Sequence, residues 1–205
     1  MSRLLAFGCS YTYGSALPDC HIPPNLPGPN PSKFAWPQLL ADKSNYECLN
    51  YGECGASNLA VLDRILNFDF KPDDIICVLW PFKNRMMEYS VNKNTNHGRW
   101  DTDWIKSQNK YDLIIKNHLF MNHGYLYLKD LGLQSYHMDV DFYHKDVYLH
   151  NELLPKWTKN IELMDIDFSK IEKIPPLGLD NLHPGIQFHK IVADKLFDKI
   201  TNVIY

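Results

Sequence analysis

Short apolar runs alternate along the chain with amphipathic stretches, and this alternation predicts an α/β fold. Residues 4–7 and 75–80 are apolar runs of strand length. The second run is almost continuously apolar, which is typical of a central strand in a parallel sheet with both faces covered. Two further strands are expected at 46–50 and 133–138.

Helical periodicity fills the intervals between these strands. Helices are predicted over 36–43, from an N-cap at Ser57 to about 67, and over about 105–130 with Gly132 as the stop. A last helix opens at Pro184 and Gly185. Its apolar residues repeat on one face, and they are Phe188, Ile191, Val192, Leu196, Phe197 and Ile200.

The order of these elements predicts a three-layer α/β/α sandwich around a mostly parallel, flavodoxin-like sheet. At 205 residues the chain fits a single domain over 1–205. Residues of about 85–160 form an irregular, insertion-like region, and 139–169 show no clear period. A loop rich in Pro, Gly and Asn is expected over 15–32, following the first strand.

Composition narrows the classes of protein that the chain can be. A formal net charge of −3 gives no electrostatic reason to expect nucleic acid. No apolar run reaches membrane-spanning length, and the N-terminus lacks a secretory leader. The five cysteines have no paired metal-type spacing, so buried free thiols and a cytoplasmic location are expected. No cofactor is expected, and the oligomeric state is not indicated.

The candidate chemistry lies at the two ends of the chain. The first strand ends in Gly8-Cys9-Ser10, which sets a serine where open α/β sheets bind their ligands. A serine hydroxyl needs a base, and the base needs a partner that fixes its tautomer. Asp180 and His183, three residues apart, could supply both. Cys9 is interpreted as a structural residue.

Three segments resemble the blocks of the SGNH (GDSL-type) hydrolase superfamily. They are Phe7-Gly8-Cys9-Ser10-Tyr11-Thr12, Asn50-Tyr51-Gly52-Glu53-Cys54-Gly55-Ala56-Ser57 and Asp180-Asn181-Leu182-His183-Pro184. The resemblance implies a catalytic triad of Ser10, His183 and Asp180. It also implies an oxyanion hole that uses the backbone N–H groups of Ser10 and Gly55.

The third block departs from the family pattern. The family has Gly-x-Asn-Asp after the third strand, whereas this chain has Trp80-Pro81-Phe82-Lys83-Asn84-Arg85. A strict match puts Phe82 at the oxyanion asparagine. Asn84 takes that role only if the turn is two residues longer, and Arg85 or Asn58 are the other candidates. Losing one oxyanion donor typically lowers the rate about 10²- to 10³-fold.

The resemblance implies an esterase that cleaves a small acyl or acetyl group from an alcohol, sugar or lipid, with acyl transfer to another acceptor left open. The altered third block supports an alternative hypothesis for the function. In that hypothesis the chain is a binding or structural module of the same fold with weak or no catalysis. A nucleotide binder is disfavoured, because no glycine-rich phosphate loop follows a strand.

One cluster invites a metal interpretation, although no metal site is expected. Alternation along a strand would put His137, Asp139 and Asp141 on one face, with His144 nearby. Acids and histidines gathered in a polar loop are more often solvated, and the cluster lacks tight His/Cys spacing. Trp80, Phe82, Trp100, Trp104 and Tyr111 could line a pocket or fill the core.

Overall fold

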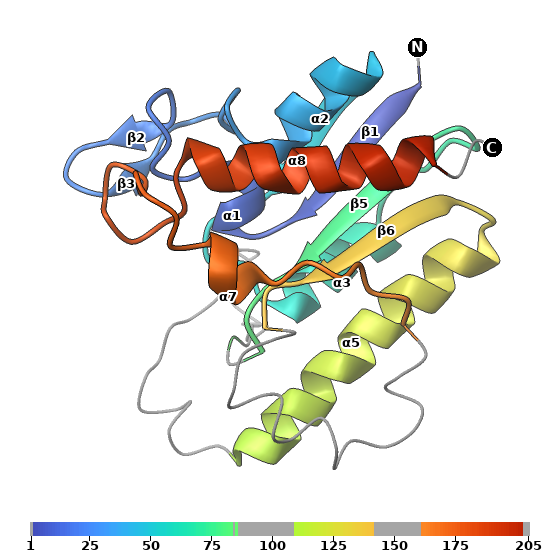
Figure 1. Ribbon diagram of the computed structural model, residues 1–205. Helices are drawn as coiled ribbons and strands as arrows, with labels where there is room; N and C mark the ends of the chain where they lie inside the picture. Colours follow the sequence, from blue (N-terminus) through green and yellow to red (C-terminus); the bar gives the residue numbers. More distant parts are fainter. Residues whose placement is uncertain (1, 84, 86–108, 142–160, 203–205) are drawn as a thin grey trace.

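Four parallel strands form the sheet at the centre of the molecule (Figure 1). The computed structural model describes residues 2–83, 85, 109–141 and 161–202. The strand order is β4-β1-β5-β6. The strands are β1 (Arg3–Gly8), β4 (Glu47–Gly52), β5 (Ile75–Trp80) and β6 (Gln134–Asp139). All four predicted strands are therefore confirmed, with small shifts at their ends.

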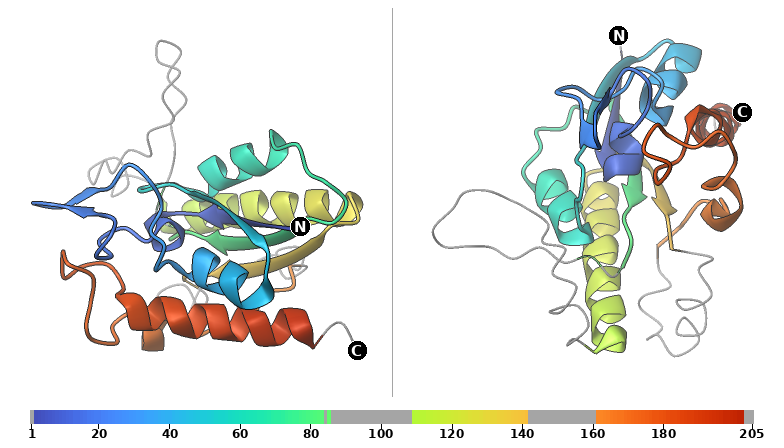
Figure 2. Two further views of the ribbon diagram at one scale, coloured as in Figure 1. Left: turned by 90° about the horizontal axis from the view of Figure 1, so that it is seen from above. Right: turned by 90° about the vertical axis from the view of Figure 1, so that its left-hand side faces the viewer.

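Helices cover both faces of this sheet (Figure 2). One face carries α2 (Trp36–Ser44) and α8 (Ile186–Thr201), which pack together, and the other carries α3 (Asn58–Leu66) and α5 (Lys110–Asp130). This arrangement confirms the predicted three-layer α/β/α architecture.

Burial explains why these residues adopt these elements. All six residues of β5 are buried, as expected for a strand with β1 and β6 on its two sides. The α8 positions that lie fully against the core include Phe188, Val192 and Leu196. The Ser57 hydroxyl accepts the Ala60 N–H at 3.3 Å, so the predicted N-cap of α3 is confirmed.

Some elements differ from the sequence expectation. The segment predicted as a loop after the first strand contains a short antiparallel hairpin, β2 (His21–Ile22) and β3 (Leu26–Pro27). The helix expected from about 105 begins at Lys110, and residues 105–108 lie outside the described residues. Within 139–169, where no period is visible, the structure forms α7 (Phe168–Ile171) and a bridge between Leu163 and His137.

The cysteines carry free thiols that differ in their burial. All five cysteines are free; Cys9, Cys20 and Cys77 are buried, and Cys48 and Cys54 are half-buried. No helix in the described part of the chain combines the length and the apolar character needed to cross a membrane.

Candidate functional site

Ser10 lies directly beyond the carboxyl end of β1. Cys9 is the N-cap of the four-residue helix α1 (Ser10–Tyr13), so Ser10 is its first residue. The turn is tight, because a Cβ atom on Gly8 would lie 2.1 Å from Thr12 Oγ1. Ser10 is 4% exposed, and the turn therefore holds its hydroxyl in a shielded position.

Asp180 and His183 are brought together by the loop between α7 and α8. Asp180 Oδ2 lies 2.5 Å from His183 Nδ1. Asp180 Oδ1 accepts the backbone N–H groups of Leu182 and His183, each at 2.9 Å. One carboxylate thus fixes both the backbone of the turn and the orientation of the imidazole.

The environment of Asp180 favours its charged form. Burial by itself raises the pKa of this carboxyl. The hydrogen bonds from the His183 and Leu182 backbone and from the His183 ring outweigh burial, so the pKa lies below the ordinary aspartate value. Asp180 is therefore a carboxylate at neutral pH.

This loop contacts α1 and the segment that follows it. The Leu179 N–H donates to Ala16 O at 2.8 Å. The rings of His183 and Tyr11 meet edge to face, with centroids 6.1 Å apart. Within the described residues, no hydrogen bond connects Ser10 Oγ with the His183 ring. Hydrogen bonds between catalytic groups are often long in an unliganded site and tighten when substrate binds.

The predicted oxyanion hole uses the backbone N–H groups of Ser10 and Gly55. The Gly55 backbone has φ of 82°, the left-handed conformation that glycine adopts without strain. Neither the Ser10 N–H nor the Gly55 N–H donates a hydrogen bond to any described residue. Asn84, the sequence candidate for the third donor, lies outside the described residues.

The turn after β5 presents an aromatic ring, that of Phe82. The Phe82 ring meets the Tyr11 ring edge to face, with centroids 5.7 Å apart. The Arg85 guanidinium lies over the Phe82 ring, with its carbon 4.8 Å from the ring centroid. Phenylalanine has no donor, so any side-chain contribution from this turn must come from a different residue.

A buried ion pair supports this turn. Lys83 Nζ lies 2.5 Å from Asp139 Oδ2 at the end of β6, and both side chains are almost completely buried. The Lys83 backbone N–H donates to Asp141 Oδ2 at 2.6 Å, and Lys83 O accepts from Asn117 Nδ2 at 2.8 Å. Asn58 in turn donates to Asn117 Oδ1 at 2.7 Å. Sequence analysis missed this network, because it depends on the register of β5 and β6.

His137 and Asp139, which the sequence offers as candidate metal ligands, have other hydrogen-bond partners. The buried His137 accepts the Trp80 Nε1–H at 3.1 Å, and burial lowers its pKa to about 3. Asp139 binds Lys83, and it also accepts the Asp141 N–H. His144 lies outside the described residues. Among those described, no three His, Cys, Asp or Glu side chains are grouped as metal ligands.

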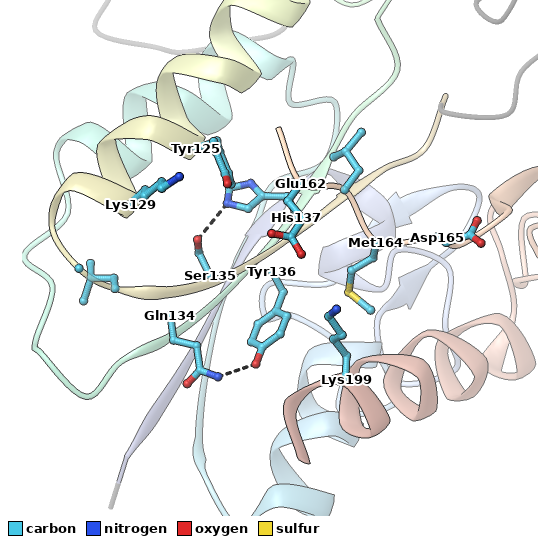
Figure 3. A pocket seen from close by; sticks show the side chains of 13 residues that line it. Tyr125, Lys129, Gln134, Ser135, Tyr136, His137, Glu162, Met164, Asp165 and Lys199 are labelled. Atoms are coloured by element: carbon cyan, nitrogen blue, oxygen red, sulfur yellow. Dashed lines mark hydrogen bonds between the residues drawn. The ribbon is translucent and has the colours of Figure 1, made fainter. Parts of the chain in front are cut away.

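A pocket of about 740 Å³ is lined by residues of α5, β6 and α8 (Figure 3). Its lining includes Gln134, the first residue of β6, which lies at the amino end of the sheet. Lys129 on α5 and Lys199 on α8 lie on its walls. Ser10, by contrast, follows the carboxyl end of β1, so this pocket is not part of the candidate site.

Comparison with known proteins rests on structure, since no protein-family model matches the chain. No curated protein matches its sequence. An acetyl xylan esterase from Butyrivibrio proteoclasticus aligns with 14% identity and a TM-score of 0.62, over 99% of this chain and 64% of its own. A carbohydrate acetylesterase from Sinorhizobium meliloti aligns with 11% identity and a TM-score of 0.58, over 99% of this chain and 100% of its own.

A third solved structure links the fold to the family named by the sequence blocks. A protein assigned to the lipolytic G-D-S-L family, from Desulfitobacterium hafniense, aligns with 12% identity and a TM-score of 0.55, over 97% of this chain and 99% of its own. The chain therefore has the α/β fold of SGNH (GDSL-type) hydrolases, as its sequence blocks predict. At these identities the similarity establishes the fold alone.

Proposed function

We propose that the protein is a serine esterase with Ser10 as nucleophile, His183 as general base and Asp180 as the residue that orients His183. The bond between Asp180 and His183 Nδ1, beside the helix that begins with Ser10, is the observation that carries this proposal. It leaves His183 Nε2 as the nitrogen that can accept a proton from a serine hydroxyl.

The proposed reaction proceeds through an acyl-enzyme. Ser10 Oγ attacks the ester carbonyl carbon while its proton passes to His183 Nε2, and the carbonyl electron pair moves onto oxygen. The N–H groups of Ser10 and Gly55 stabilise that oxyanion. The tetrahedral intermediate then collapses, the bond to the alcohol breaks, and Nε2 returns the proton to the leaving oxygen. Water releases the acyl group by the same steps.

The substrate class that we propose is a small acyl ester, with an acetyl group on a carbohydrate as the first to test. Two structural neighbours are, by name, an acetyl xylan esterase and a carbohydrate acetylesterase. The acidic balance of the chain agrees with a neutral substrate better than with a polyanion.

A fluorophosphonate probe tests the nucleophile directly. The native protein is expected to become covalently labelled, and Ser10→Ala is expected to lose both labelling and hydrolysis of p-nitrophenyl acetate. Ser15→Ala, a nearby buried serine, is the matched control and is expected to keep both. No labelling of the native protein, or equal labelling of Ser10→Ala, would contradict the proposal.

One observation favours a second function. A strict match of the third sequence block puts Phe82 at the oxyanion asparagine, and phenylalanine has no donor, which suits a module that binds esters or glycans without turning them over. The same experiment separates the two functions, because a binding module would not react with the probe. It would still bind acetylated oligosaccharides in calorimetry.

A further inference from the structure

Arg85 lies between the two loops that carry the backbone oxyanion donors. Its Nη1 is 3.5 Å from Ala56 O, in the residue that follows Gly55. Its guanidinium carbon is 4.8 Å from the centroid of the Phe82 ring, and that ring contacts Tyr11, the residue that follows Ser10. One cation thus contacts the loop of Gly55 directly and reaches the segment of Ser10 through the Phe82 ring.

The electrostatics agree with this position. Burial raises the pKa of the Cys54 thiol to about 11 and also raises the pKa of the Tyr11 hydroxyl, and the positive charge of Arg85 opposes both shifts. Cys54 precedes Gly55, and Tyr11 follows Ser10, so the Arg85 charge acts on both sides of the site.

The chemistry of arginine suits a developing negative charge. Guanidinium stays protonated at any physiological pH and offers five N–H donors in a planar fork. Arg85 is only 8% exposed, and a cation shielded from water interacts more strongly with a nearby oxyanion than one in solvent. Two interactions hold the turn in place. One is the Lys83–Asp139 ion pair, and the other is the hydrogen bond from the backbone N–H of Arg85 to Phe82 O, at 3.1 Å.

We propose that Arg85 is a catalytic residue whose guanidinium stabilises the oxyanion, in place of the asparagine side chain that SGNH hydrolases carry after the third strand. Phe82 falls at the position of that asparagine in a strict match of the sequence block, and the guanidinium lies over its ring. This inference rests on the proposed esterase function.

Kinetics of p-nitrophenyl acetate hydrolysis test the inference. Arg85→Ala is expected to lower kcat by about 10²- to 10³-fold with KM little changed, as for the loss of an oxyanion donor. Arg85→Lys, which keeps the charge and loses the fork, is expected to lie between native protein and Arg85→Ala. Added guanidinium ion is expected to restore part of the kcat of Arg85→Ala, whereas ammonium ion is not.

Two controls make the result specific. Arg3→Gln breaks a half-buried ion pair with Asp74 at the amino end of β1, so it reports what a loss of stability alone does to kcat. Ser10→Ala is measured in parallel. Unchanged kcat in Arg85→Ala, with Ser10→Ala inactive, would overturn the role of Arg85 and leave the esterase intact.

Other outcomes are equally decisive. A loss confined to KM, and seen only with esters that carry a carboxylate, would overturn the inference by making Arg85 a substrate anchor. If Ser10→Ala hydrolyses the ester as fast as the native protein, the proposed function fails, and the role of Arg85 fails with it.

Discussion

At the scale of single residues, Asp180 has the most constrained surroundings in the candidate site. Its two oxygens accept two backbone N–H groups and contact the His183 ring. Sequence reasoning could propose Ser10, Asp180 and His183, because each stands in a short local motif. It could not find the Lys83–Asp139 pair, since those partners are 56 positions apart and meet only in the folded sheet.

Asp180→Asn is expected to disable the proposed base with little effect on folding. An asparagine amide would donate to His183 Nδ1 and place the ring proton on Nε2, where it blocks proton acceptance from serine. An equivalent change in a serine protease lowers kcat by about 10⁴. Steady-state kinetics would measure the loss. Asp194→Asn, on the exposed face of α8, is the control, and a loss below tenfold in Asp180→Asn would contradict the assigned role.

At the scale of elements, the sheet was predictable and its connections were less so. The strand β5 and the apolar face of α8 follow directly from hydrophobic patterning. The hairpin of β2 and β3 could not be predicted in this way, because each strand has only two residues and two positions cannot show a hydrophobic period. The turn after β5 is held by a lysine that patterning would place in solvent.

Lys83→Met is expected to destabilise the fold strongly, because it leaves the buried Asp139 carboxylate without its counter-ion. Removing one partner of a buried ion pair costs about 3–5 kcal/mol. The double variant with Asp139→Asn removes both charges and keeps an oxygen for the Asp141 N–H, so it should recover much of the loss. Urea denaturation would measure both.

The exposed Lys43–Asp194 pair provides the comparison for that experiment. Both of its side chains are about half exposed, and such pairs contribute roughly 1 kcal/mol or less. Lys43→Met should therefore be nearly neutral. A double variant at Lys83 and Asp139 that is as unstable as Lys83→Met alone would show that charge burial is not the cause.

At the scale of the whole molecule, three buried histidines make the fold sensitive to acid. Burial lowers the pKa of His118 to about 4 and of His137 and His189 to about 3, against an ordinary 6.5. His189 Nδ1 accepts the Trp36 N–H at 3.1 Å, and His137 Nδ1 accepts from Trp80. Each of these bonds needs an unprotonated nitrogen.

Stability is expected to fall as the pH drops below about 6.5. The unfolded chain binds protons there, whereas the folded chain does not until the pH approaches the lowered values, so unfolding takes up as many as about three protons. Each contributes roughly 1 kcal/mol per pH unit. Urea denaturation between pH 7 and 4 would measure the slope. His189→Asn, which keeps an acceptor near Nδ1, should reduce the uptake by about one proton; an unchanged slope would contradict this.

The contacts between the loop before α8 and the segment after β1 join opposite ends of the chain. Leu179 bonds to Ala16, and His183 lies against Tyr11. Such distant pairing forms late, because the intervening chain must first be ordered. A growing polypeptide would therefore expose its serine long before a base could reach it. Hydrolytic competence would then appear only in molecules whose first strand and last loop have found each other.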